Sequence, residues 1–120
     1  MANGIALIQN TDLKDLYDSL NQLYNALIKS LDGISNNAEA QAVFNESGEV
    51  LHRIDLVQRL LFTKASGKIS AAVAEVINAN AKAVASLAEI AKITEAVKTV
   101  TQILTLVDKA IDLAKMVALA

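Results

Sequence analysis

The chain has 120 residues, which is enough for one domain, and 53% of them are hydrophobic although only 3% are aromatic. Alanine occurs 21 times, whereas proline, cysteine and tryptophan are absent, so helix-forming residues dominate and a disulfide scaffold or a thiolate nucleophile is excluded. A net charge of −2 supplies no basic field for nucleic acid. The sequence therefore predicts one all-α domain over residues 1–120 that needs no metal or cofactor to fold.

The first predicted helix begins at a cap formed by Asn10 or Thr11 and ends near Gly33. Its apolar residues recur in steps of three and four, which places them on one stripe of a helix. They are Leu13, Leu16, Tyr17, Leu20, Leu23, Tyr24, Leu27 and Leu31. We expect Gly33 to take the left-handed conformation that ends many helices, with Ile34 folding back onto the last turn.

A second helix is predicted from Asn36 or Asn37, because Glu39 follows Asn36 at capping-box spacing. A buried face centred on Ile54 would contain Val43, Ser47, Val50, Leu51, Val57, Leu61 and Ala65. Gly48 lies in the middle of this helix, where it would mark either a kink or an end followed by a restart. Ser66 and Gly67 are expected to end the helix, with Gly67 as its C-cap.

Residues 68–120 contain no glycine or proline, so they form either one helix about 75 Å long or two helices of about 25 residues. The apolar phase slips near 91–94, which favours a turn there with Thr94 as cap, and 77–80 is the rival break because it holds two asparagines. The turn near Thr94 leads us to favour four helices over three in an antiparallel up-down bundle.

Several residues resemble parts of chemical sites without completing one. Glu49 and His52 have the Glu-x-x-His spacing of di-iron bundles, but His52 is the single histidine and would face solvent. Asp108 and Asp112 could hold a cation, but no third oxygen ligand is indicated. Ser66-Gly67-Lys68 lacks the first glycine of a phosphate-binding loop. We therefore predict no catalytic, cofactor-binding or metal-binding residues and no enzyme activity.

Tyr17 and Tyr24 lie one heptad apart and could stack on a ligand. Tyrosines at the edge of an apolar stripe more commonly bury the ring and leave the hydroxyl in water. We therefore expect both rings to pack at the edge of the core, and no small-molecule substrate is evident.

Apolar side chains left over after one seam is buried predict a non-catalytic interaction or assembly module, most simply one that self-associates. The candidate surface consists of Leu56, Leu60, Ile103, Leu106, Leu113 and Val117. The predicted partner is a protein, either this chain itself or an unknown one.

Two other functions stay open. A membrane-active helical protein is the alternative, because residues 93–120 are rich in apolar side chains and contain no helix breaker. An apolar ligand cavity among the alanines of 71–91 is a third reading. The first ten residues carry no lysine or arginine, so no secretory signal is expected and the cytoplasm is the default compartment, with leaderless export left open.

Overall fold

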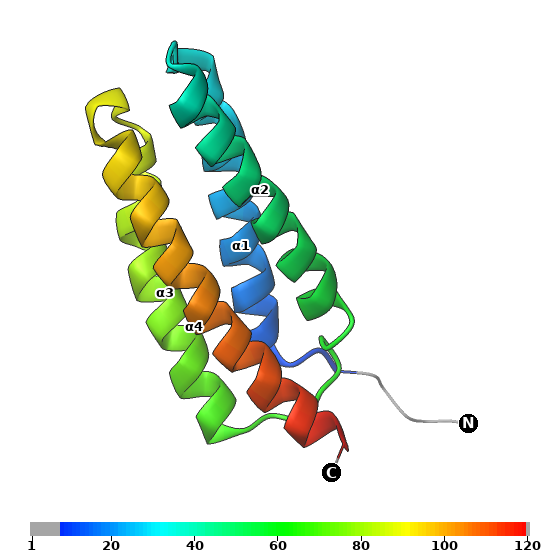
Figure 1. Cartoon of the computed structure of the whole chain (residues 1–120). Helices are drawn as coiled ribbons and strands as arrows, with labels where there is room; N and C mark the ends of the chain where they lie inside the picture. Colours follow the sequence, from blue (N-terminus) through cyan, green and yellow to red (C-terminus); the bar gives the residue numbers. More distant parts are fainter. Residues whose placement is uncertain (1–7, 120) are drawn as a thin grey trace.

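A computed structural model describes residues 8–119 and places them in four α-helices without strands in that range (Figure 1). The helices are α1 (Thr11–Ser30), α2 (Asn37–Gln58), α3 (Gly67–Leu87) and α4 (Ile93–Leu119), and single 3-10 turns cover Leu31–Gly33 and Ile90–Lys92. The predicted all-α fold with four helices is confirmed. Because the chain turns between Leu87 and Ile93, the reading as one helix of about 75 Å is wrong, and so is the break at 77–80, which lies inside α3.

The four helices form two antiparallel hairpins that lie side by side. α1 packs against α2 and α3, and α4 packs against α3 and α2, so α1 and α4 stand at opposite corners of the bundle. Successive helices run in opposite directions, as predicted, but the neighbours α1 and α3 run parallel, and so do α2 and α4 (Figure 1). The segment from α2 to α3 therefore crosses one end of an elongated molecule of 57 × 25 × 20 Å.

Large aliphatic side chains fill the space between the four helices. α1 contributes its stripe of leucines, and α2, α3 and α4 add mainly valine, isoleucine and alanine. The largest fully buried side chains are Leu13, Leu16, Leu20, Leu23, Leu27, Val43, Val50, Val57, Ile69, Val73, Ile93 and Ile103. Tyr17 and Tyr24 are half-buried against this core, as their place at the edge of the α1 stripe predicted.

The side chains of Asn10, Asn36 and Ser66 cap the starts of α1, α2 and α3. Oδ1 of Asn10 accepts a hydrogen bond from the Leu13 amide at 3.1 Å, and Oδ1 of Asn36 accepts one from the Glu39 amide at 3.0 Å. The Asn10 backbone also donates to the Leu61 carbonyl at 2.6 Å and its side chain donates to the Thr63 carbonyl at 3.0 Å. Asn10 thus ties the start of α1 to the segment that follows α2.

The predicted ends at Gly33, Ser66–Gly67 and Thr94 are wrong, and one alternative at Gly48 is excluded. Gly33 does not adopt a left-handed φ; a Cβ there would lie 2.7 Å from Cδ1 of Ile90, which is the end of an exposed side chain. α2 ends at Gln58, before Ser66, and Gly67 is the first residue of α3 rather than a C-cap. Thr94 lies inside α4, which begins at Ile93. Gly48 causes no restart, since α2 continues through it.

Candidate interaction surface

The six residues predicted to form an interaction surface lie inside or against the core. Ile103 is fully buried, so its prediction as a surface residue is wrong. The other five, Leu56, Leu60, Leu106, Leu113 and Val117, are half-buried and pack against the core cluster. The physical reason is that α4 contacts both α2 and α3, so its wide apolar arc is covered by the chain's own helices.

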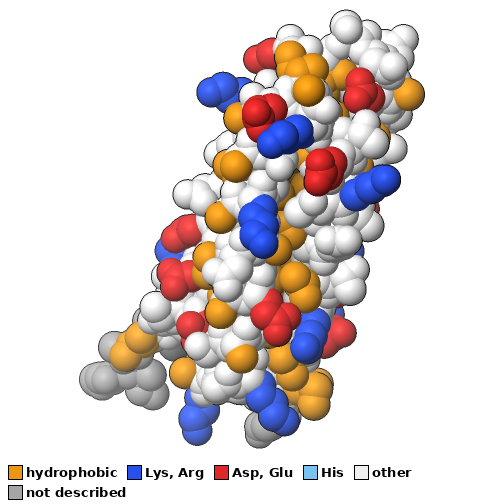
Figure 2. Space-filling view, turned by 90° about the vertical axis from the view of Figure 1, so that its left-hand side faces the viewer, with side chains coloured by type: hydrophobic (Ala, Val, Ile, Leu, Met, Phe, Trp, Pro, Cys, Tyr) orange, Lys and Arg blue, Asp and Glu red, His pale blue; other side chains and the backbone are white. Residues whose placement is uncertain are grey.

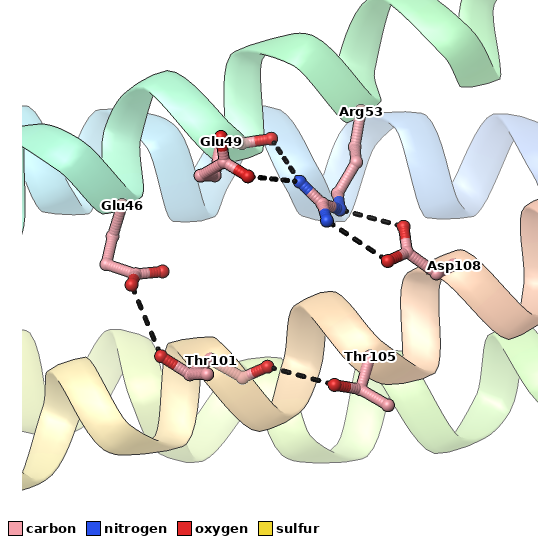
Figure 3. A network of polar contacts seen from close by, with 6 residues as sticks. All are labelled: Glu46, Glu49, Arg53, Thr101, Thr105 and Asp108. Carbon is pink, nitrogen blue, oxygen red and sulfur yellow. Dashed lines mark hydrogen bonds and ion pairs between the residues drawn. The ribbon is translucent and has the colours of Figure 1, made fainter.

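A ladder of polar contacts joins the parallel helices α2 and α4 at heptad spacing, and Figure 3 shows its steps at Glu46 and Arg53. The Thr94 hydroxyl donates to Glu39 and the Thr101 hydroxyl donates to Glu46, both at 3.2 Å. One heptad further on, Arg53 donates to Asp108 through Nε at 2.9 Å and through Nη2 at 3.0 Å. This flank of α2 is therefore occupied by α4.

Arg53 is the most strongly bound charged group of this ladder. Its Nη1 also donates to the Glu49 carboxylate at 3.2 Å, and its side chain is only 14% exposed. Burial on its own would lower the pKa of the guanidinium, but the hydrogen bonds to Asp108 and Glu49 outweigh burial and raise the pKa above its ordinary value. Arg53 therefore stays charged and holds both carboxylates in place.

The carboxylate of Glu46 has fewer hydrogen-bond partners than its burial calls for. One carboxylate oxygen accepts from Thr101, whereas Oε2 is buried without a hydrogen-bond donor among residues 8–119. Burial raises the pKa of Glu46; the Thr101 hydrogen bond lowers it, and the negative charge of Glu49 raises it further. The ionised Glu46 carboxylate is therefore less favourable in the folded chain than in water.

Large apolar side chains are exposed along the other flank of α2. Phe44 is 60% exposed and Leu51 is 50% exposed, although Leu51 was predicted to be buried. Glu39, Glu46 and Arg53 point toward α4, and at 100° per residue Phe44 and Leu51 lie on the opposite flank, toward α1. The buried arc of α2 is shifted toward α4, which leaves Leu51 outside it.

The matching flank of α1 carries Tyr17, Tyr24 and Ile28. The hairpin is closed by the 31–36 connection at one end and by the Asn10–Leu61 hydrogen bond at the other, so its antiparallel register places Tyr24 level with Phe44. The same register places Tyr17 level with Leu51. We call the five residues Tyr17, Tyr24, Ile28, Phe44 and Leu51 the α1–α2 face.

Charged residues are absent from the half of this face that holds Tyr24, Ile28 and Phe44. Residues 19–28 of α1 and residues 40–45 of α2 include none, and their exposed polar positions hold amides such as Gln22, Asn25, Gln41 and Asn45. Aromatic enrichment and charge depletion are what distinguish the centre of a protein–protein interface from ordinary surface. The half of the α1–α2 face around Tyr24 and Phe44 has both properties, whereas Lys14 lies over the Tyr17 ring and Asp55 lies one helical turn from Leu51.

The outer face of α3 and α4 has a different composition. In Figure 2, which looks at this side of the molecule, small apolar patches alternate with charged side chains of both signs. The exposed apolar residues of α3 are alanines, at positions 71, 74, 81 and 85. The larger exposed apolar residues of this hairpin, Ile90, Met116 and Leu119, lie in its turn or in the last turn of α4.

The sequence motifs that resembled chemical sites are separated in the structure. His52 is exposed, Asp108 is paired with Arg53, and Asp112 is exposed. Within residues 8–119 no three histidine, cysteine, aspartate or glutamate side chains are placed to share a metal ion.

A groove of about 410 Å³ lies between α1 and α3 near the Ile90–Lys92 turn, and it opens to solvent. Its lining is mainly apolar and consists of Ala26, Lys29, Ser30, Gly33, Val84, Leu87, Ala88 and Ile90. This open groove is not the internal ligand cavity predicted among the alanines of 71–91, since Ala88 is the one alanine of that segment in its lining. None of the four described helices is long and apolar enough to cross a membrane.

Comparison of the chain with protein-family models, with curated proteins and with solved structures found no match. The interaction surface therefore rests on the residues of this chain alone. Two features of the sequence point to it: the heptad spacing of Phe44 and Leu51, and the uncharged stretch 19–28.

Proposed function

We propose that this chain is a non-catalytic protein-interaction module and that the α1–α2 face is its binding surface. The observation that carries the proposal is the exposure of two large apolar side chains on one flank of α2, Phe44 in an uncharged part of the surface and Leu51 two turns further on. Burying a large apolar side chain stabilises a complex, whereas leaving it in water stabilises neither the fold nor a complex. A partner that covers these two side chains would gain from both.

A protein partner fits this face better than a lipid surface does. Helices that lie on membranes carry lysine and arginine beside the apolar face. Beside the α1–α2 face, Lys14 lies over the Tyr17 ring and is paired with Asp18 at 2.8 Å, so the face carries no excess of basic charge. The apolar arc of α4 that motivated the membrane-active alternative is covered by α2 and α3.

Site-specific photo-crosslinking tests this function. A benzophenone amino acid replaces Phe44 in one variant and Ala81, at an exposed position on α3, in the matched control. We expect irradiation in cells that produce the protein to give a discrete protein adduct from position 44 and none from position 81. Equal adducts from both positions, or an adduct from neither, would contradict the proposal. Co-sedimentation with anionic vesicles through Phe44 would support the membrane alternative instead.

A further inference from the structure

We infer that one end of the bundle docks onto an anionic lipid bilayer, with apolar side chains entering the lipid and lysines binding its headgroups. This end consists of residues 8–15, 54–71 and 115–119, and we call it the basic end; it is the lower end of the molecule in Figure 1. It is a different surface from the α1–α2 face, so the inference goes beyond the proposed function and does not rest on it.

Contacts between the helices bring the three segments of the basic end together. The Asn10 amide donates to the Leu61 carbonyl, so residues 8–10 lie beside the 59–66 connection. Each step of the α2–α4 ladder joins residues that are 55 positions apart. The same register places Met116, near the end of α4, level with Leu61.

Large apolar side chains are exposed at the basic end. Ile8, Phe62, Met116 and Leu119 are each at least 54% exposed. They are half of the exposed large apolar side chains within residues 8–119. Because the bundle is 25 × 20 Å across, these side chains share a small surface that a bilayer can cover at once. Transfer of such side chains from water to lipid is favourable.

Lysines without an acidic partner accompany these apolar side chains. Residues 56–74 include three basic residues and no acidic one. Lys64, Lys68 and Lys115 are exposed and form no ion pair within residues 8–119. In Figure 2, lysine or arginine side chains lie next to hydrophobic ones at the lower end of the molecule. An anionic membrane attracts each lysine near its surface, and the attraction increases with the number of lysines.

The two ends of the bundle carry opposite charge. The basic end has a net charge of +2, and the opposite end, residues 26–41 and 83–97, has a net charge of −2. The charged residues are Lys14, Arg59, Lys64, Lys68 and Lys115 against Asp12, Asp15 and Asp55 at the basic end, and Lys29 and Lys92 against Asp32, Glu39, Glu89 and Glu95 at the opposite end. An anionic surface therefore attracts the first end and repels the second. Docking in this orientation leaves the α1–α2 face, on the side of the bundle, open to a protein partner.

Lipid fits the basic end better than nucleic acid does. Ile8, Met116 and Leu119 have no aromatic ring on which a base could stack, whereas acyl chains accept any apolar side chain. An apolar contact or a basic cluster gives only weak membrane binding by itself, and the two together bind more firmly. The basic end supplies both.

A single tryptophan reports insertion, because the chain has none of its own. Phe62→Trp places it at the basic end, and the matched control Ile90→Trp places it at the opposite end, where Ile90 is 59% exposed. With vesicles of phosphatidylcholine and phosphatidylserine, we expect the emission of Phe62→Trp to shift to shorter wavelength and that of Ile90→Trp to stay unchanged. Equal shifts, or a shift at position 90 alone, would overturn docking by the basic end.

Charge reversal tests the role of the lysines by co-sedimentation with the same vesicles. Lys64→Glu combined with Lys68→Glu is expected to weaken binding at least tenfold. The control, Lys29→Glu combined with Lys92→Glu, changes the net charge by the same amount at the opposite end and should leave binding unchanged. Helical content by circular dichroism checks that both variants fold. Equal losses in the two variants would trace binding to net charge and overturn the basic end as the site.

The wild-type chain gives the simplest outcome. Sedimentation with vesicles that contain phosphatidylserine, and weaker sedimentation with phosphatidylcholine alone, would uphold the inference. A chain that stays in solution with both kinds of vesicle would overturn it, as would binding to a single-stranded oligonucleotide without binding to vesicles. A protein adduct from position 44 would in either case still uphold the proposed function, since Phe44 lies outside the basic end.

Discussion

Glu46 and Leu20 represent the two ways in which single residues set the stability of this bundle. Leu20 is fully buried among other aliphatic side chains and contributes by removing apolar surface from water. Glu46 places a carboxylate between α2 and α4, where one of its oxygens has no donor within the described range 8–119. The first residue therefore stabilises the fold, and the ionised form of the second opposes it.

The titration of Glu46 gives a pH-dependent prediction. Because burial raises the pKa of Glu46 in the folded chain, the folded chain binds this proton more tightly than the unfolded chain does. Glu46 therefore favours folding while it is protonated, and this contribution is lost as the pH rises through its raised pKa. Glu46→Gln should increase the free energy of unfolding at pH 7, and the gain should disappear below the ordinary glutamate pKa of 4.5. Urea denaturation of the wild type and of Glu46→Gln, at pH 7 and again below pH 4.5, measures this difference in the free energy of unfolding. A variant less stable than the wild type at pH 7 would contradict the prediction.

Truncation of a core leucine should leave a cavity. Leu20→Ala is expected to reduce the free energy of unfolding by about 2–5 kcal/mol, and Leu104→Ala by a similar amount. Leu51→Ala is the matched control, with an expected loss of about 1 kcal/mol or less because half of that side chain is already in water. Thermal and denaturant melts compare the three variants. Equal losses at Leu20 and Leu51 would show that Leu51 belongs to the core.

At the scale of the helices, the sequence was informative wherever local chemistry decides the outcome. The cap at Asn36 and the stripe of α1 follow from short-range spacing, and both are confirmed. The pair Asn78 and Asn80 suggested a break because asparagine is a poor helix former. Asn80 is instead buried and donates to the Ser19 carbonyl of α1 at 3.1 Å, a contact between distant segments that helix propensity does not contain.

The Arg53–Asp108 pair is the strongest polar link between the hairpins, and its removal tests the α2–α4 ladder. Asp108→Ala is expected to cost about 1 kcal/mol, since the pair is bidentate but Asp108 is half exposed and screened by solvent. A double-mutant cycle with Arg53→Met isolates the coupling between the two side chains. Asp55→Ala, which breaks the exposed Asp55–Arg59 pair at the end of α2, serves as control and should cost less. A coupling energy of zero would remove this pair as a link.

At the scale of the whole molecule, the fold class could be predicted but the order of the helices around the core could not. The 59–66 connection carries no pattern that says whether α3 lies beside α2 or beside α1, and the structure places it beside α1. That choice also decides which apolar rows are covered. If α4 packed against one helix, the apolar row that contains Ile103 would stay exposed. Because α4 packs against both α2 and α3, Ile103 is buried. Phe44 and Leu51 were missed because the width of the buried arc on α2 depends on the position of α4.

Photo-crosslinking from position 44 tests the central claim most directly. The chain that carries the benzophenone amino acid at position 44 is compared with one that also carries Leu51→Glu. A discrete protein adduct is expected from the first and none from the second, with unchanged helical content, because the exposed Phe44 and Leu51 side chains lie under the same partner. No adduct from the first chain, or equal adducts from both, would contradict binding through the α1–α2 face.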